Sequence, residues 1–405
     1  MGMGIRVSFR NISYLFSFSM FFLLSATTTS AKMVTYIKEY SYQASEADSK
    51  LSSRTIALEQ VKRLLLEELG TYLVSETTVK NLKLTKDQIT SLTAGIVMTV
   101  IIEEKWDGKT YFLKAKITTD TDTLVRSIDL LRRNYEQSRT LEEARVRSEK
   151  AVKEIEKLKK EIGRGEGDKV SQENYTKAVN KLDAVDWFKK GFALRYSGDE
   201  IMGKNDREAM KAFDKAIEID PDYAHAYAGR AAIYNTWAQY DKALKESERA
   251  IKLDPDLAWG YNCRGFAHTG LMNYQGAIQD LNKAIILAPE YAWPYCNRSW
   301  THMRMKKYQQ ALEDANKAIE LAPKLSTGYF WRGRAHASLN NFRDAIRDFD
   351  KAIEFNPTYS WSFFHRGYAL LKINKTEEAA EDFKRAASLG NKEAENYLKR
   401  KGIPR

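Results

Sequence analysis

A seven-residue phrase that returns every 34 residues constrains this chain more than any other feature of its sequence. Its prolines are five of the seven in the chain, and each one ends a phrase because proline cannot continue a helix. The strict spacing indicates an array of equal units that together bury a continuous core. The copies are KAIEIDP at 215–221, RAIKLDP at 249–255, KAIILAP at 283–289, KAIELAP at 317–323 and KAIEFNP at 351–357.

Small residues recur at two positions in each unit, where two helices must approach closely. One set is Ala209, Ala243, Ala277, Ala311 and Ala345, and the other is Ala216, Ala250, Ala284, Ala318 and Ala352. An aromatic residue opens the preceding helix, at Trp187, Tyr227, Tyr261, Tyr295, Tyr329 and Phe363. In most copies Arg-Gly or a near equivalent follows, as in Arg264-Gly265 and Arg366-Gly367. The pattern resembles the tetratricopeptide repeat, in which each unit is a helix-turn-helix.

This resemblance implies a mainly α fold whose C-terminal part is an α-solenoid. About six repeats are expected over residues 184–391, and residues 392–405 are expected to form a charged helix that caps the open end. The first unit has about six additional residues around GDEIMG, and the last has Asn391 where the others have proline. For function, the resemblance implies binding of proteins or peptides.

Residues 32–133 are predicted to form a small α+β domain. VTYIKEYSY alternates apolar and aromatic residues as a half-buried strand does. Two β-rich runs then meet at Asp107-Gly108, a pair suited to a tight hairpin turn. The arrangement resembles the small envelope domain of the LPP20 lipoprotein and flagellar FlgT N-terminal type, which implies an envelope-associated binding domain. Between strand and hairpin, apolar residues have helical spacing, at Leu51, Leu58, Val61, Leu65, Leu69 and Tyr72.

Residues 134–170 are predicted to form a charged helical spacer followed by a glycine hinge. A heptad-like seam of apolar and small residues runs along 134–163, through Leu141, Ala144, Ser148, Ala151, Ile155, Leu158 and Ile162. The seam covers about three heptads, so a single spacer helix and a short coiled coil between two copies both remain open. GRGEGD at 163–168 then ends the helix and lacks the Gly-Lys-Ser/Thr element of a phosphate-binding loop.

Residues 1–31 have the three zones of a secretory signal peptide. Arg6 and Arg10 precede the apolar stretch ISYLFSFSMFFLLSA, and the run TTTSA ends at Ala31. The apolar run of roughly 15 residues is shorter than the ~20 that a membrane-spanning helix needs. We therefore expect a periplasmic or secreted protein, with an uncleaved anchor in the inner membrane as the alternative.

Residue types that support catalysis or bind metals are scarce or unsuitably placed. His268, His302 and His336 repeat every 34 residues, but equivalent residues in neighbouring repeats should lie ~8–10 Å apart, too far to share one zinc ion. No His or Cys precedes His225, so the α+β domain lacks Ser-His or Cys-His nucleophilic machinery. We predict a protein that is not an enzyme and uses no metal or cofactor.

The charge and the cysteines point to no further partner class. The net charge of +11 comes from 65 basic and 54 acidic residues without a concentrated Lys/Arg tract, which does not indicate nucleic acid binding. The two cysteines, Cys263 and Cys296, are expected to be free thiols on neighbouring helices, which pack too far apart for a disulfide.

In the tetratricopeptide family the first helices line a concave groove. Transferred by position, the residues facing it are Trp259, Asn262, Phe266, Trp293, Cys296, Trp300, Thr327, Phe330, Arg334, Trp361, Phe364 and Tyr368. Aromatic side chains bury much area with little entropy to lose, so this groove suits an apolar peptide, with Arg334 available for an acidic group. The alternative is that several of these aromatics only fill space between helices. The Lys and Asn of the family's carboxylate clamp are not matched.

These patterns favour a non-enzymatic, exported adaptor. Its repeats would hold a protein or peptide partner in the cell envelope, and its α+β domain would dock to an envelope structure. One alternative is an accessory protein of an envelope enzyme system that binds polysaccharide or cell wall through residues 32–133. Another is a structural oligomer assembled through residues 134–163.

Overall fold

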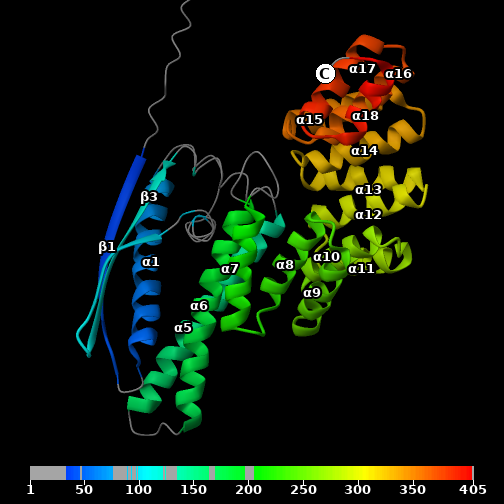
Figure 1. The fold of residues 1–405 in the computed structure, drawn as a ribbon. Coiled ribbons are helices and arrows are strands. Elements are labelled where there is room, and N and C mark those ends of the chain that lie inside the picture. The colour runs from blue at the N-terminus through cyan, green and yellow to red at the C-terminus, as the bar shows by residue number, and fades with distance from the viewer. Residues whose placement is uncertain are drawn as a thin grey trace, which may run out of the picture.

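The computed structural model describes residues 33–45, 48–75, 89, 93, 97, 99–121, 124, 135–163, 169–196 and 205–403. Within them the chain forms three strands, a long helix beside the sheet and a run of paired helices (Figure 1). The predicted signal peptide, the glycine-rich segment after residue 163 and the enlarged turn of the first repeat lie outside these ranges. No helix in the described part of the chain has both the length and the apolar character to span a membrane.

The predicted hairpin is present and belongs to a three-stranded antiparallel sheet. In the turn, Gly108 has a φ of 96°, a conformation that suits a residue without a side chain. The Asp107 carboxylate accepts hydrogen bonds from the backbone N–H groups of Lys109 and Thr110, at 2.8 and 2.7 Å. The strand order is β1-β3-β2, with β1 at Met33–Gln43, β2 at Thr99–Trp106 and β3 at Thr110–Asp120.

One face of the sheet packs on α1, Lys50–Ser75. The opposite face carries exposed apolar residues, since Ile37 and Val100 are about half exposed. The prediction was wrong for Leu51, which is 68% exposed, because it lies to one side of the stripe that faces the sheet. That stripe recurs every four residues and is fully buried with alternate residues of β3, the two sets being Ala57, Val61, Leu65, Leu69 and Leu73 from α1, and Leu113, Ala115 and Ile117 from β3.

The charged helix is present as α5, Tyr135–Gly163, but it is not a free spacer. It packs along α6, Lys169–Tyr196, whose own residues Ala178, Leu182 and Val185 are buried. The predicted seam is therefore covered from within the same chain, and this corrects both the spacer and the coiled-coil interpretations. Leu141, Ala144, Ser148, Ala151, Ile155 and Leu158 are buried, and Ile162 is half-buried.

The helix α6 also joins the sheet to the repeats. Lys62 of α1 forms an ion pair with Asp186 of α6, and the Tyr175 hydroxyl of α6 donates a hydrogen bond to Asp48, just before α1. A single hydrophobic core continues from the sheet through α1, α5 and α6 into the first repeats. The α+β region and the first repeats are consequently packed together, where we predicted separate units joined by a spacer.

The six predicted repeats are present as six helix pairs that stack from α6 to α17 (Figure 1). The first helix of the first pair begins at Lys169, earlier than the predicted start at residue 184. The charged helix α18 covers the last pair, with the Tyr397 ring 4.1 Å from that of Phe383. The remaining bounds are α7 Asp206–Ile219, α8 Ala224–Thr236, α9 Tyr240–Leu253, α10 Ala258–Gly270, α11 Tyr274–Leu287, α12 Ala292–Arg304, α13 Tyr308–Leu321, α14 Ser326–Ser338, α15 Phe342–Phe355, α16 Ser360–Lys372, α17 Thr376–Ser388 and α18 Lys392–Lys401.

The Arg-Gly motif and its near equivalents hold five of the six helix pairs together. The glycine lets a large side chain of the second helix approach, since a Cβ on Gly333 would lie 2.9 Å from the Phe349 ring. The arginine of the first helix pairs with a carboxylate 16 residues later on the second helix, at N–O distances of 2.6 to 2.7 Å. These pairs are Arg230–Glu246, Arg264–Asp280, Arg298–Asp314, Arg332–Asp348 and Arg366–Asp382.

Candidate functional site

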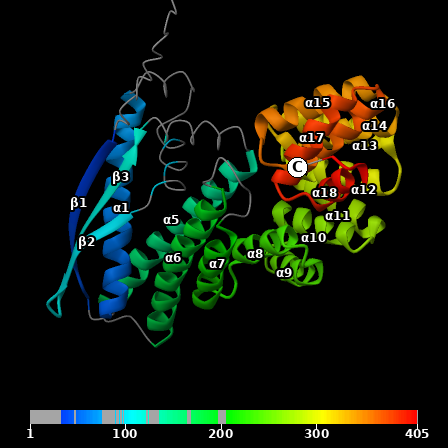
Figure 2. The same cartoon turned by 45° about the horizontal axis from the view of Figure 1, so that its top comes forward.

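The first helices of successive repeats contact one another and form one layer of the stack. The helices α8, α10, α12, α14 and α16 follow each other in this layer, and the pairs turn as a curved stack (Figure 2). The side chains of Phe266 on α10 and Trp300 on α12 are 34 residues apart in sequence, yet their ring centroids are 4.7 Å apart. Equivalent positions of neighbouring repeats therefore meet in a continuous surface, which we call the inner face.

The twelve predicted groove residues form four triplets, one on each of α10, α12, α14 and α16. The middle residue of each triplet is buried between helices. Phe330 contacts the rings of Phe349 and Tyr359, at centroid distances of 6.1 and 5.1 Å. Asn262 donates a hydrogen bond to the Tyr291 hydroxyl at 3.1 Å. These side chains support the inner face from below, so they do not line it as predicted. The four residues are Asn262, Cys296, Phe330 and Phe364, none more than 7% exposed.

The first residues of the triplets have mixed surroundings. Trp259 is 3% exposed because it packs edge-on against Phe192 of α6, so this predicted groove residue belongs to the core. Trp293 and Thr327 are half-buried. Trp361 is half-buried as well and stacks on His365 with ring centroids 5.7 Å apart.

The last residue of each triplet lies nearest to the surface. Phe266, Trp300 and Arg334 are half-buried, and Tyr368 is 38% exposed beside the capping helix, where it contacts Tyr397. At this position, unlike the other two, none of the predicted residues is buried. This is because the position lies one turn beyond the residue that packs between the helices.

Trp331 belongs to the same surface, although position transfer did not select it. Its ring stacks on Trp300 at 6.2 Å with an interplanar angle of 25°, and the Arg334 guanidinium lies 5.8 Å from its centroid. With Phe266 these residues form an unbroken run across α10, α12 and α14, in which each side chain contacts the next. We call Phe266, Trp300, Trp331 and Arg334 the inner ladder.

Arg334 is half-buried and, unlike the five arginines that pair with second-helix carboxylates, forms an ion pair with no carboxylate in the described ranges. Its Nη1 donates a hydrogen bond to Nε2 of His365 at 3.0 Å. Burial lowers the pKa of Arg334, and the nearby Arg304 adds to this effect. Burial and Arg334 together hold the pKa of His365 well below its usual range. The imidazole is therefore neutral, and its Nε2 is an acceptor for the guanidinium.

The inner layer carries an uneven distribution of charge that our sequence reasoning missed. The helices α8, α10, α12, α14 and α16 contain no Asp or Glu, whereas they hold seven arginines and all five histidines. Five of these arginines are neutralised by carboxylates of the second helices. Arg304 and Arg334 are left without a carboxylate across residues 205–403. Counting acidic residues separately for the two helices of each repeat would have revealed this asymmetry.

The periodic histidines pack within their own repeats. His268, His302 and His336 lie 3.6 to 3.9 Å from the carboxylates of Asp280, Asp314 and Asp348, which also hold the Arg-Gly arginines. Burial lowers the pKa of His302, with Asp314 opposing this effect. The described ranges contain no group of three or more His, Cys, Asp or Glu that could hold a metal ion.

Both cysteines are buried, on α10 and α12, and neither forms a disulfide. Burial raises the pKa of Cys296, so this thiol stays protonated and unreactive near neutral pH. Cys263 and Cys296 are therefore parts of the packing between repeats.

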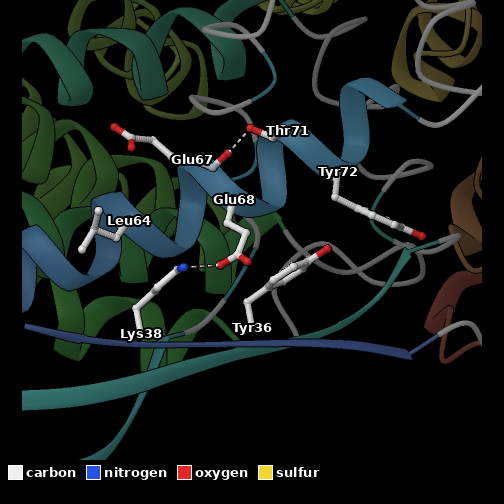
Figure 3. Close-up of a pocket in the computed structure, with 7 residues that line it drawn as sticks. All are labelled: Tyr36, Lys38, Leu64, Glu67, Glu68, Thr71 and Tyr72. Atoms are coloured by element: carbon white, nitrogen blue, oxygen red, sulfur yellow. Dashed lines mark hydrogen bonds and ion pairs between the residues drawn. The ribbon is translucent and has the colours of Figure 1, made fainter.

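A shallow pocket lies between β1 and α1 in the α+β region (Figure 3). Lys38 and Glu68 form an ion pair at 2.9 Å across it, and the ring centroids of Tyr36 and Tyr72 are 6.3 Å apart at one end. The Thr71 hydroxyl donates to the Glu67 carbonyl within the helix. The pocket combines aromatic faces with polar groups, and Leu64 completes its lining.

A stack of helix pairs with a continuous inner face is the architecture of repeat scaffolds for protein–protein interaction. Models of the tetratricopeptide repeat match residues 212–245, 292–325, 326–359 and 349–381. The chain therefore contains tetratricopeptide repeats. These matches lie within the repeats, and the resemblance of residues 32–133 to the LPP20 type remains a prediction.

Several solved structures are similar to parts of this chain at low sequence identity. YrrB, described as a tetratricopeptide repeat protein with an unusual peptide-binding site, is 22% identical over 45% of this chain and 93% of its own, with a TM-score of 0.33. A tetratricopeptide repeat protein from Parabacteroides merdae is 22% identical over 62% and 97%, with a TM-score of 0.43. Pseudomonas aeruginosa pilF is 21% identical over 55% and 99%, with a TM-score of 0.43. No curated protein sequence matches the chain.

Proposed function

We propose that the repeats bind an extended segment of a partner protein along the inner ladder. The observation that carries this proposal is the unbroken run of half-buried rings from Phe266 through Trp300 to Trp331. The run crosses three repeats, and each of its rings keeps part of its surface accessible. A bound segment would remove the remaining aromatic area from water, which is the main favourable contribution at protein interfaces.

The geometry of the ladder favours an extended guest. The ring centroids of Phe266 and Trp300 are 4.7 Å apart, and those of Trp300 and Trp331 are 6.2 Å apart. Side chains on one face of an extended segment recur every second residue, at roughly 6.5–7 Å. An apolar side chain could therefore contact each ring in turn while the backbone of the segment stays near the surface.

The proposal is tested by selecting short random peptides with the full chain and with a Trp300→Ala variant. Enriched peptides should bind the variant at least about tenfold more weakly, since central aromatic residues commonly contribute ~2 kcal/mol or more to an interface. Trp237→Ala is the matched control, because Trp237 is 37% exposed at the end of α8 and lies outside the ladder. Equal binding by wild type and Trp300→Ala would refute the proposal.

We further propose that the protein works as an adaptor after export to the cell envelope, without enzymatic activity of its own. The three zones of residues 1–31 support export, and the packing of the α+β region onto α6 supports a fixed display of the repeats. Fractionation of cells that make the full chain, with N-terminal sequencing of the product, tests both cleavage and location. Recovery in the cytoplasm with residues 1–31 intact would contradict export.

The alternative polysaccharide-binding role is favoured by one observation, the pocket between β1 and α1. Tyrosine faces beside charged and polar groups suit a sugar ring, which has both apolar and hydroxyl surfaces. If this role holds, the full chain should bind cell-wall polysaccharide and Tyr72→Ala should weaken that binding. Unchanged or absent binding would leave the pocket as a packing feature. In the structural-oligomer alternative, the seam of α5 was to join two copies, but α6 of the same chain covers it. The mass of the full chain in solution tests this alternative.

A further inference from the structure

We infer that the partner segment carries an Asp or Glu side chain whose carboxylate binds Arg334 at the end of the inner ladder. The inference rests on the proposed peptide-binding function and narrows its ligand class to acidic segments. The observations behind it are the open hydrogen-bonding edge of Arg334, the absence of acidic residues from the inner layer and the continuity of Arg334 with the aromatic rings.

The Arg334 guanidinium has one edge in use and another available. Nη1 donates to His365, while Nε and Nη2 find no acceptor among the residues that the structure describes. The Nε–Nη2 edge presents two parallel donors, which match the two oxygens of a carboxylate. His365 is itself fixed by stacking on Phe349 and Trp361, with interplanar angles of 24° and 21°. The guanidinium is therefore held in place before any ligand arrives.

The arginines that pair with carboxylates elsewhere in the repeats show what is missing at Arg334. Arg332, two residues earlier on the same helix, has the Asp348 carboxylate at 2.6 Å. Arg334 is surrounded by Phe330, Trp331 and a neutral imidazole, none of which can neutralise its charge. A half-buried cation without a counter-ion is unfavourable, and a ligand carboxylate would remove that cost.

The charge of the whole inner layer favours the same ligand. Because α8, α10, α12, α14 and α16 contain no acidic residue, no carboxylate of these helices competes for Arg334. Arg304 at the end of α12 adds a second positive charge near Arg334. An acidic segment would be attracted to this end of the ladder, and the attraction would weaken with added salt.

The position of Arg334 also predicts the order of residues in the ligand. Trp331 lies under the guanidinium, and Trp300 and Phe266 follow towards the N-terminal repeats. The ligand should therefore have apolar residues at alternate positions on one side of the acidic residue, either before it or after it in sequence. A free chain terminus is not required, because the inner face lacks the Lys and Asn of a carboxylate clamp.

The test uses short random peptides displayed without a free C-terminus and selected with the full chain. The enriched sequences should contain an acidic residue beside apolar ones. A synthetic peptide from this set, and its Glu→Gln or Asp→Asn form, are then titrated against wild type, Arg334→Gln and Arg343→Gln. Arg343 is a matched control because it is exposed, unpaired among the described residues, and lies on the second helix α15.

Wild type should bind the amide peptide at least about tenfold more weakly than the acidic peptide, whereas Arg334→Gln should bind the two peptides equally. Arg343→Gln should behave as wild type does. Peptides that depend on Trp300 but show no preference for an acid would overturn this inference and leave the proposed function intact. If no peptide is enriched, or Trp300→Ala has no effect, both fail. The peptide substitution needs no protein variant, so the test holds even if Arg334→Gln does not fold.

Discussion

The N-terminal assembly, from β1 to α7, and the regular repeats, from α8 to α17, are stabilised in different ways. In the N-terminal assembly, large side chains from segments far apart in sequence share one core, as Leu65, Leu113 and Phe188 do. In the later repeats, the buried clusters are smaller and combine alanines such as Ala318 and Ala352 with aromatic rings from the same or a neighbouring repeat. Contacts that recur locally can be predicted from a repeating sequence, whereas contacts between distant and unique segments cannot.

The two regions also differ in how they bury charge. Arg195 and Asp206 form a pair at 2.6 Å in the first repeat, with side chains 5% and 1% exposed. In the fourth repeat the ion pair between the two helices is Arg298–Asp314, and its arginine side chain is 22% exposed. Water can still reach one partner of the second pair. Loss of a carboxylate should therefore be more harmful in the N-terminal assembly than in the regular repeats.

The largest effect is expected for Asp206→Ala. It leaves the Arg195 guanidinium buried without a counter-ion, and breaking such a buried pair costs about 3–5 kcal/mol of unfolding free energy. Chemical denaturation followed by circular dichroism measures the change. A smaller loss of unfolding free energy for Asp206→Ala than for Asp314→Ala would contradict the proposed difference between the regions.

A slightly smaller effect is expected for Leu65→Ala in the core between α1 and the sheet. Leu65 is fully buried, so its truncation leaves a cavity and should cost about 2–5 kcal/mol. Leu51→Ala on the same helix is the control, because Leu51 is mostly exposed and should cost less than about 0.5 kcal/mol. Equal losses for the two variants would show that the α1–sheet core is not formed as described.

A moderate effect is expected for Asp314→Ala in the fourth repeat. The change removes the carboxylate that holds Arg298 and lies beside His302, at a cost of about 1–3 kcal/mol. The arginine can turn partly to solvent, which limits the loss. Hydrogen exchange would locate the damage, and we expect increased exchange in α12 and α13 with little change in α1.

The smallest effect is expected from pH through His365. Its depressed pKa means that the folded state keeps the imidazole neutral, while the unfolded chain takes up a proton below about pH 6.5. Stability should therefore fall as the pH is lowered from 7.5 to 5, by about 1–2 kcal/mol from this group. His365→Phe keeps an aromatic ring and should lose that part of the pH dependence. Identical pH profiles for wild type and variant would contradict a buried neutral His365.

The 34-residue phrase, the alanines and the Arg-Gly motif were enough to predict six helix pairs and a capping helix. Asp107-Gly108 and the alternation of VTYIKEYSY likewise predicted the hairpin and the first strand. These features depend on interactions within one element or between neighbours in sequence, so the local pattern determines them. The prediction that first helices expose a mainly aromatic surface also came from position within the repeat.

Only the tertiary structure decided which of those aromatics are accessible and which are buried. Phe330 and Trp300 occupy comparable faces of their helices, yet Phe330 is enclosed by Phe349 and Tyr359 from other elements, while Trp300 is half-buried. The seam of α5 was visible in the sequence, but its partner α6 was not. Arg334 was visible in the sequence too, but the sequence did not show that no carboxylate pairs with it. Burial and charge pairing depend on which distant side chains arrive in the folded chain, and a local pattern contains no information about that.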